Sequence, residues 1–124
     1  MDKFQAAFEV LYLLAIDGSV DEREIQEINA YINDNLGKSD YDTHATANAL
    51  AHLTPEGKTN ELFKAGGFLN DVCSPTDKIN LLDFAYRVIV ADGEVSEVEK
   101  GVFFELGRMW QIDIDQFLAE RESA

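Results

Sequence analysis

Two stretches of the chain share one pattern: Leu14-Ala15-Ile16-Asp17-Gly18-Ser19-Val20-Asp21-Glu22-Arg23-Glu24 and Ile89-Val90-Ala91-Asp92-Gly93-Glu94-Val95-Ser96-Glu97-Val98-Glu99. Corresponding residues are 75 positions apart, and both copies contain Asp-Gly-x-Val-x-x-x-Glu. Each copy follows an apolar segment and precedes an amphipathic one. The repeat predicts two similar helix–loop–helix units at approximately 4–37 and 79–112, separated by a divergent helical middle over 38–78. A stacked solenoid is not expected, because such arrays need about three or more repeats.

The spacing of apolar residues predicts helices throughout. Apolar side chains recur about every 3.6 positions from Phe4 to Ala15 and from Ile25 to Leu36, and Gly37 is expected to end the second helix. Further helices are expected over 42–53, from Pro55, from Pro75, across 102–110 and after Asp113. The first of these is expected to place the apolar residues Ala45, Ala49 and Leu53 on one side. Gly66-Gly67 is expected to weaken or break the helix from Pro55, since an interior Gly costs about 1 kcal/mol relative to Ala. No stretch has the alternation typical of a strand.

The predicted fold class is therefore all-α: a single-domain bundle of about six to seven helices with two pseudo-symmetric repeats. The chain has 124 residues, an ordinary length for one domain. Its longest apolar run is far short of the ~20 residues of a membrane helix, and its start does not resemble a signal peptide. A cytoplasmic protein without membrane insertion is expected.

The charge balance restricts the class of partner. The chain carries 24 Asp and Glu against 10 Lys and Arg, a net charge of −14. This argues against direct binding of nucleic acid and against docking on anionic membranes, since both need a basic surface. It favours cations, basic protein partners or simple solubility.

The repeated motif resembles part of a calcium-binding EF-hand, but that geometry is rejected. Loop positions one and three should supply oxygen ligands. They fall on Leu13 and Ala15 in the first copy and on Val88 and Val90 in the second. Half of the coordination shell would be hydrocarbon.

Helix capping and a cation site of another geometry both stay open. Asp21 with Glu24, and Ser96 with Glu99, fit capping boxes. Capping explains the Asp before each Gly less well, because a carboxylate near a helix C-terminus opposes the dipole by roughly 0.3–1 kcal/mol. A compensating partner is expected, either the N-terminal amides of the next helix or a bound cation. If the two loops meet, up to eight carboxylates crowd one surface and favour a divalent cation. They are Asp17, Asp21, Glu22, Glu24, Asp92, Glu94, Glu97 and Glu99.

The other candidate residues favour structural roles. His44 and His52 are eight positions apart and fit no zinc spacing with Cys73, so solvated or hydrogen-bonded histidines and a core thiol are expected. Phe103, Phe104, Met109 and Trp110 are expected in the core, with Phe104 and Trp110 as candidates for a partner groove. No feature selects a catalytic pair, so the protein is not expected to be an enzyme.

The twin segments resemble the tellurite-resistance TerB family, whose helical module also occurs beside J-domains in some membrane-tethered co-chaperones. The resemblance covers both repeat units, and Met109-Trp110-Gln111-Ile112-Asp113 is similar to the family's ending. It implies an all-helical domain, a non-enzymatic role in bacterial stress response, including resistance to tellurite or other toxic anions, and protein partners, some at the membrane's inner face. It also implies association with a divalent cation (Ca²⁺, Mg²⁺ or Zn²⁺). By position, the family's motif acids fall on Asp17, Glu24, Asp92 and Glu99, while Ile16 replaces the usual small residue.

Two functions from different classes follow. The first is a TerB-like stress-response module that binds a protein partner, with or without a divalent cation at the acidic loops. The alternative is an acidic inhibitor, for example a phage-encoded nucleic-acid mimic, that occupies a basic groove. Neutralising the four motif acids should abolish the first function but only weaken the second in a salt-dependent way.

Overall fold

The computed structural model describes residues 2–15, 22–37, 42–91 and 97–122. These residues form seven helices and no strand, so the predicted all-α class is confirmed for the described part of the chain. The helices are α1 (Lys3–Ala15), α2 (Glu22–Asn35), α3 (Thr43–Ala51), α4 (Pro55–Val72), α5 (Pro75–Ala91), α6 (Glu97–Trp110) and α7 (Ile114–Glu122). None of these helices has the length and apolarity that crossing a membrane requires.

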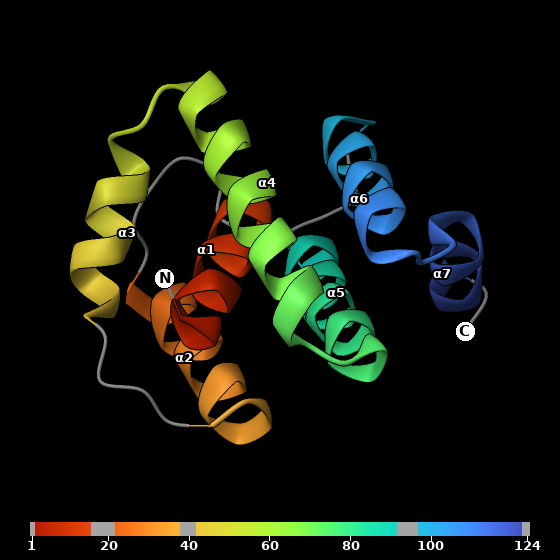
Figure 1. Cartoon of the computed structure of the whole chain (residues 1–124), viewed down its shortest axis with the longest axis horizontal. Coiled ribbons are helices and arrows are strands. Elements are labelled where there is room, and N and C mark those ends of the chain that lie inside the picture. Colours follow the sequence, from red (N-terminus) through yellow and green to blue (C-terminus); the bar gives the residue numbers. More distant parts are fainter. Residues whose placement is uncertain (1, 16–21, 38–41, 92–96, 123–124) are drawn as a thin grey trace.

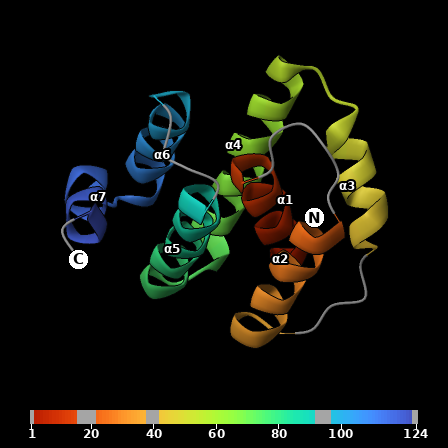
Figure 2. The same cartoon turned by 180° about the vertical axis from the view of Figure 1, so that it is seen from behind.

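Helix α1 lies at the centre of the first five helices. It contacts α2, α3, α4 and α5, most extensively α4. All residues from Ala6 to Tyr12 are buried, so α1 lacks the broad polar face of an ordinary surface helix. Figure 1 shows α3 at one edge of the molecule and α6 with α7 at the other, and Figure 2 shows the same order from behind. Helix α4 runs between these two parts and contacts both α1 and α6.

Several helix ends lie where the sequence predicts them. Thr54 Oγ1 accepts a 3.0 Å hydrogen bond from Gly57 N, with Pro55 as the first residue of α4. Gly37 follows α2 with φ of 113°, in the left-handed region that favours glycine. The other described N-terminal caps are Asp2 for α1, Asp42 for α3, Ser74 for α5 and Asp113 for α7. Helices α2 and α6 begin one residue after the predicted caps Asp21 and Ser96, which lie outside the described residues.

The predicted break at Gly66-Gly67 is wrong, because α4 is continuous from Pro55 to Val72. The physical reason is contact with α6. A Cβ on Gly66 would lie 2.9 Å from Leu106 Cδ2, and Trp110 Nε1 donates a 2.8 Å hydrogen bond to Gly66 O. Tertiary packing therefore outweighs the weak helix propensity of glycine.

The predicted apolar face of the third helix is also corrected. Ala45, Ala49 and Leu53 were expected on one side, but all three are exposed, and Leu53 lies just beyond the end of α3. The side chains that α3 buries are Ala47 and Leu50. The pseudo-symmetry of the two repeats stays a prediction, and α1 contacts α2 more extensively than α5 contacts α6.

Candidate functional site

The predicted acidic site lies partly outside the described residues. Asp17, Asp21, Asp92 and Glu94 all fall there, so their predicted roles as ligands or caps stay predictions. Glu99 belongs to α6, with its side chain outside the described set. The described members of the group are Glu22 and Glu24 in the first turn of α2, and Glu97 at the start of α6.

Glu22 connects the start of α2 with α3. Both of its carboxylate oxygens lie 2.9 Å from Nε2 of His44, and both side chains are exposed. The hydrogen bond and then the charge of Glu22 raise the pKa of His44 above its usual 6.5. His52 Nδ1 lies 2.7 Å from Asn48 O. The prediction that both histidines are solvated or hydrogen-bonded is confirmed.

Glu24 is half-buried beside α1. Its Oε2 atom is buried. The pKa of Tyr12 is raised above its usual 10, first by the burial of Tyr12 and second by the negative charge of Glu24. Tyr12 is a buried residue of α1, so the carboxylate of Glu24 lies at the junction of the first two helices. Across the described ranges, no group of three or more His, Cys, Asp or Glu is placed to hold a metal ion. The described motif acids therefore do not by themselves assemble a metal centre.

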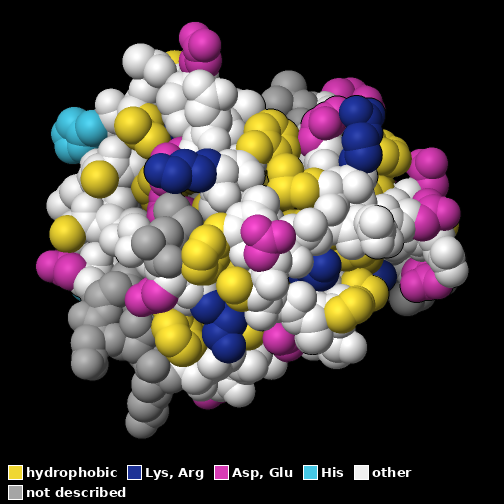
Figure 3. Space-filling view, viewed as in Figure 1, with side chains coloured by type: hydrophobic (Ala, Val, Ile, Leu, Met, Phe, Trp, Pro, Cys, Tyr) yellow, Lys and Arg dark blue, Asp and Glu magenta, His cyan; other side chains and the backbone are white. Residues whose placement is uncertain are grey.

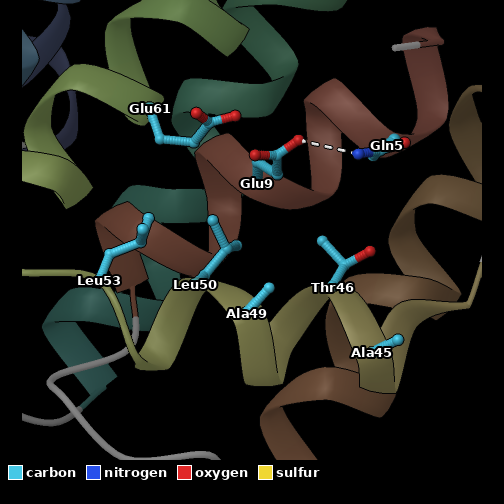
Figure 4. Close-up of a pocket in the computed structure, with 8 residues that line it drawn as sticks. All are labelled: Gln5, Glu9, Ala45, Thr46, Ala49, Leu50, Leu53 and Glu61. Carbon is cyan, nitrogen blue, oxygen red and sulfur yellow. Dashed lines mark hydrogen bonds between the residues drawn. The ribbon is translucent and has the colours of Figure 1, made fainter.

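A cavity between α1, α3 and α4 contains a different acidic pair. Its volume is about 410 Å³. Figure 4 shows the carboxyl groups of Glu9, from α1, and Glu61, from α4, turned toward each other, with side chains of α3 on the opposite side. Glu9 is only 2% exposed, although it is ionisable. The lining residues are Gln5, Glu9, Ala45, Thr46, Ala49, Leu50, Leu53 and Glu61.

The surroundings of Glu9 favour its protonated form. Burial, followed by the hydrogen bond and the negative charge of Glu61, raises the pKa of Glu9 from the usual 4.5 to about 7. Gln5 Nε2 donates a 3.3 Å hydrogen bond to Glu9 Oε2 and, like the positive charge of Lys64, acts in the opposite direction. A hydrogen bond between two carboxyl groups requires one proton, so near neutral pH the pair holds a shared proton part of the time.

Sequence analysis does not single out this pair, although one signal is present. Glu9 is the only charged residue between Phe4 and Ala15, within an otherwise apolar segment. A lone acid on a helix that is buried all round needs a partner. Glu61 gives no such signal, because it lies in a polar stretch and reaches Glu9 only when α4 packs on α1.

A second cavity, of about 380 Å³, lies between the start of α5 and the connection from α6 to α7. Ile79, Trp110 and Phe117 form much of its apolar lining, and Asp113 and Glu120 are its acidic residues. Ile79 is 40% exposed, whereas Trp110 is 3% exposed. Trp110 thus lies in the core and also lines a surface cavity.

The remaining candidates are structural. Phe103 is fully buried and Met109 is partly buried, as predicted. The predicted core position of Phe104 is wrong, because its side chain is 41% exposed on α6, and it does not line the second cavity. Cys73 is a buried core residue, and burial raises the pKa of its thiol, which opposes formation of a reactive thiolate.

Comparison with known proteins assigns the family. The family model described as "Tellurite resistance protein TerB" matches residues 5–122. The match begins in α1 and ends at the last residue of α7, so it extends over all seven described helices. Searches of curated proteins and of solved structures gave no significant match. On the strength of this nearly full-length match, the chain belongs to the TerB family.

Proposed function

We propose that the protein is a non-enzymatic, TerB-type stress-response module that binds a protein partner. Membership of the TerB family and the net charge of −14 support this proposal. Figure 3 shows acidic side chains distributed across one face of the molecule rather than gathered in a single patch. A surface of this charge attracts basic partners at long range, with a strength that falls as salt is added.

The partner-binding surface in this proposal is the second cavity. The observation that supports this choice is the exposure of Ile79. Its large apolar side chain is 40% exposed and lines the same cavity as the acidic residues Asp113 and Glu120. The cation of Arg121 is already engaged, since its Nε lies 2.8 Å from Asp83 Oδ1. Such a surface suits a partner segment that combines an apolar anchor with Lys or Arg.

The test compares two double variants in partner capture by quantitative mass spectrometry. Ile79→Ser/Glu120→Lys alters the second cavity and is expected to lose the proteins that the wild type captures. Leu53→Ser/Glu27→Lys makes the same chemical changes at other exposed positions and is expected to retain them. Equal capture by both variants would show that the second cavity is not the binding surface. Loss that follows only net charge and salt would favour the acidic-inhibitor alternative.

The divalent-cation hypothesis is the second part of the proposal and concerns the two Asp-Gly segments. It is supported by the repeated motif and by the preference of Ca²⁺ and Mg²⁺ for carboxylate oxygens. The test is the thermal melting of chelator-treated protein with and without millimolar Ca²⁺, Mg²⁺ or Zn²⁺. A specific ion at about 100 times its Kd adds about 2.7 kcal/mol of stability. Asp17→Asn/Asp92→Asn is expected to abolish that shift, and the absence of any shift would leave the motifs as helix caps.

A further inference from the structure

The cavity between α1, α3 and α4 combines two chemically different sides. Glu9 and Glu61 lie on one side, and Ala45, Ala49 and Leu50 of α3 lie on the other (Figure 4). Glu9 is buried, whereas Ala45 and Ala49 are exposed, so the cavity extends from an internal acid to the molecular surface. Its volume of about 410 Å³ lies within the range of small-ligand sites, roughly 300–1,000 Å³.

We propose that this cavity binds a primary alkylamine, with the ammonium group between Glu9 and Glu61 and the hydrocarbon chain along α3. The acidic pair supplies charged acceptors for the N–H groups of an ammonium. Ala49, Leu50 and Leu53 supply apolar surface for a chain of several methylene groups. This site is separate from the second cavity, so the proposal does not depend on the proposed partner surface.

The electrostatics favour a single positive charge. The pair comprises two carboxyl groups, and the positive charge of Lys64 already favours the ionised form of Glu9. An ammonium placed directly between the carboxyl groups would act in the same direction and replace the shared proton. A divalent metal fits less well, since Ca²⁺ takes six to eight oxygen ligands and Mg²⁺ needs near-ideal octahedral geometry.

Proton competition gives the site a defined pH dependence. The ionisable groups that act on Glu9 are Glu61 and Lys64 of α4, and the lining residues of α3 carry no ionisable group. Because the pKa of Glu9 is about 7, binding of an ammonium is expected to weaken by about thirtyfold between about pH 8 and about pH 5.5.

The experiment is an NMR titration of the full chain with ¹³C-labelled Ala and Leu methyl groups. The probes are n-pentylamine and its neutral analogue n-pentanol. We expect saturable shifts of the methyl signals of Ala45, Ala49, Leu50 and Leu53 with the amine, and no comparable saturation with the alcohol. Glu61→Gln should weaken amine binding by about tenfold, because it removes a charge-assisted acceptor.

Two further variants distinguish the site from general attraction to an acidic protein. Glu27→Gln removes one exposed carboxylate of α2 and should leave the affinity unchanged. Ala49→Phe fills the cavity from an exposed position and should block binding while both acids remain. The proposal is overturned if the amine gives no saturable shift, if n-pentanol binds equally well, or if Glu61→Gln and Glu27→Gln have the same effect. Shifts confined to methyl groups elsewhere would also overturn it.

Discussion

Trp110 donates a 2.8 Å hydrogen bond from its indole Nε1 to the backbone oxygen of Gly66, although 44 positions separate the two residues. The contact fixes the end of α6 against the middle of α4. It depends on close approach, because a Cβ on Gly66 would lie 2.9 Å from Leu106 Cδ2. Gly66 therefore contributes to stability through packing although it is a poor helix former.

The adjacent glycines should respond oppositely to alanine. Gly66→Ala is expected to lower the free energy of unfolding by about 1 kcal/mol, because crowding against Leu106 exceeds the gain in helix propensity. Gly67→Ala should raise it by about 1 kcal/mol, since its nearest neighbour would be Met109 Sδ at an ordinary 3.9 Å. Urea unfolding of both variants measures the difference. Equal changes would contradict the role of the α4–α6 contact.

Removing the indole should cost more than removing an exposed ring on the same helix. Trp110→Phe is expected to lower the free energy of unfolding by about 2–3 kcal/mol, because a buried hydrogen bond and core volume are lost together. Phe104→Leu, at a position that is 41% exposed, should change it by less than about 0.5 kcal/mol. Circular dichroism is the suitable probe, since Trp110 is the only tryptophan. Similar losses in the two variants would argue against the hydrogen bond as a main contributor.

The buried acid should make stability depend on pH in an unusual direction. The pKa of Glu9 is raised to about 7 in the folded state. The stabilisation that protonated Glu9 adds to the free energy of unfolding is therefore fully present below about pH 4.5 and is lost as pH rises through 7. Glu9→Gln removes this dependence. Relative to wild type, the variant should gain about 2 kcal/mol between about pH 4.5 and pH 7.5, after allowance for solvent in the cavity.

Urea unfolding across this pH range measures that difference. The exposed variant Glu27→Gln controls for the loss of one negative charge from an acidic protein. A constant difference between Glu9→Gln and wild type at all pH values would show that the pKa of Glu9 is the same in the folded and unfolded states, which contradicts the raised pKa.

The link between α2 and α3 should be visible in the titration of one histidine. Hydrogen bonding and charge from Glu22 raise the pKa of His44, so Glu22→Gln should move it back toward 6.5. The attraction between Glu22 and His44 is present at pH values where His44 is protonated, and it is lost as pH rises through the folded-state pKa of His44. NMR titration of the imidazole protons provides the measurement, with Glu27→Gln on the same helix as the control. An unchanged pKa in Glu22→Gln would mean that the two side chains do not interact in solution.

Local features of the fold were predictable from sequence, whereas long-range ones were not. Thr54-Pro55 and Gly37 fix helix ends through hydrogen bonds and backbone angles within a few residues, so their pattern was readable. The continuity of α4 through Gly66-Gly67 depends on Leu106 and Trp110, and no local rule contains that contact. The face that α3 buries likewise depends on the position of α1.

The same division applies to the candidate sites. The repeated acidic motif is visible in the sequence, but its predicted ligands lie mostly outside the described residues, so their role stays a prediction. Glu9 and Glu61 lie on two different helices and are 52 positions apart in the sequence, so only the packing of these helices brings the two residues together. A lone acid in an apolar helix, as at Glu9, is the kind of local signal that can direct attention to such a pair.

The central position of α1 has a consequence for synthesis. Translation makes α1 before α4 and α5, which cover much of it, and α5 ends 76 residues after α1. At ~5–20 residues per second, the roughly 40 residues between α1 and α4 take about 2–8 s. During that interval the buried residues Phe8 and Leu11 belong to a helix that still lacks its contacts with α4 and α5. The nascent chain thus presents an apolar helix to ribosome-associated chaperones before it can fold.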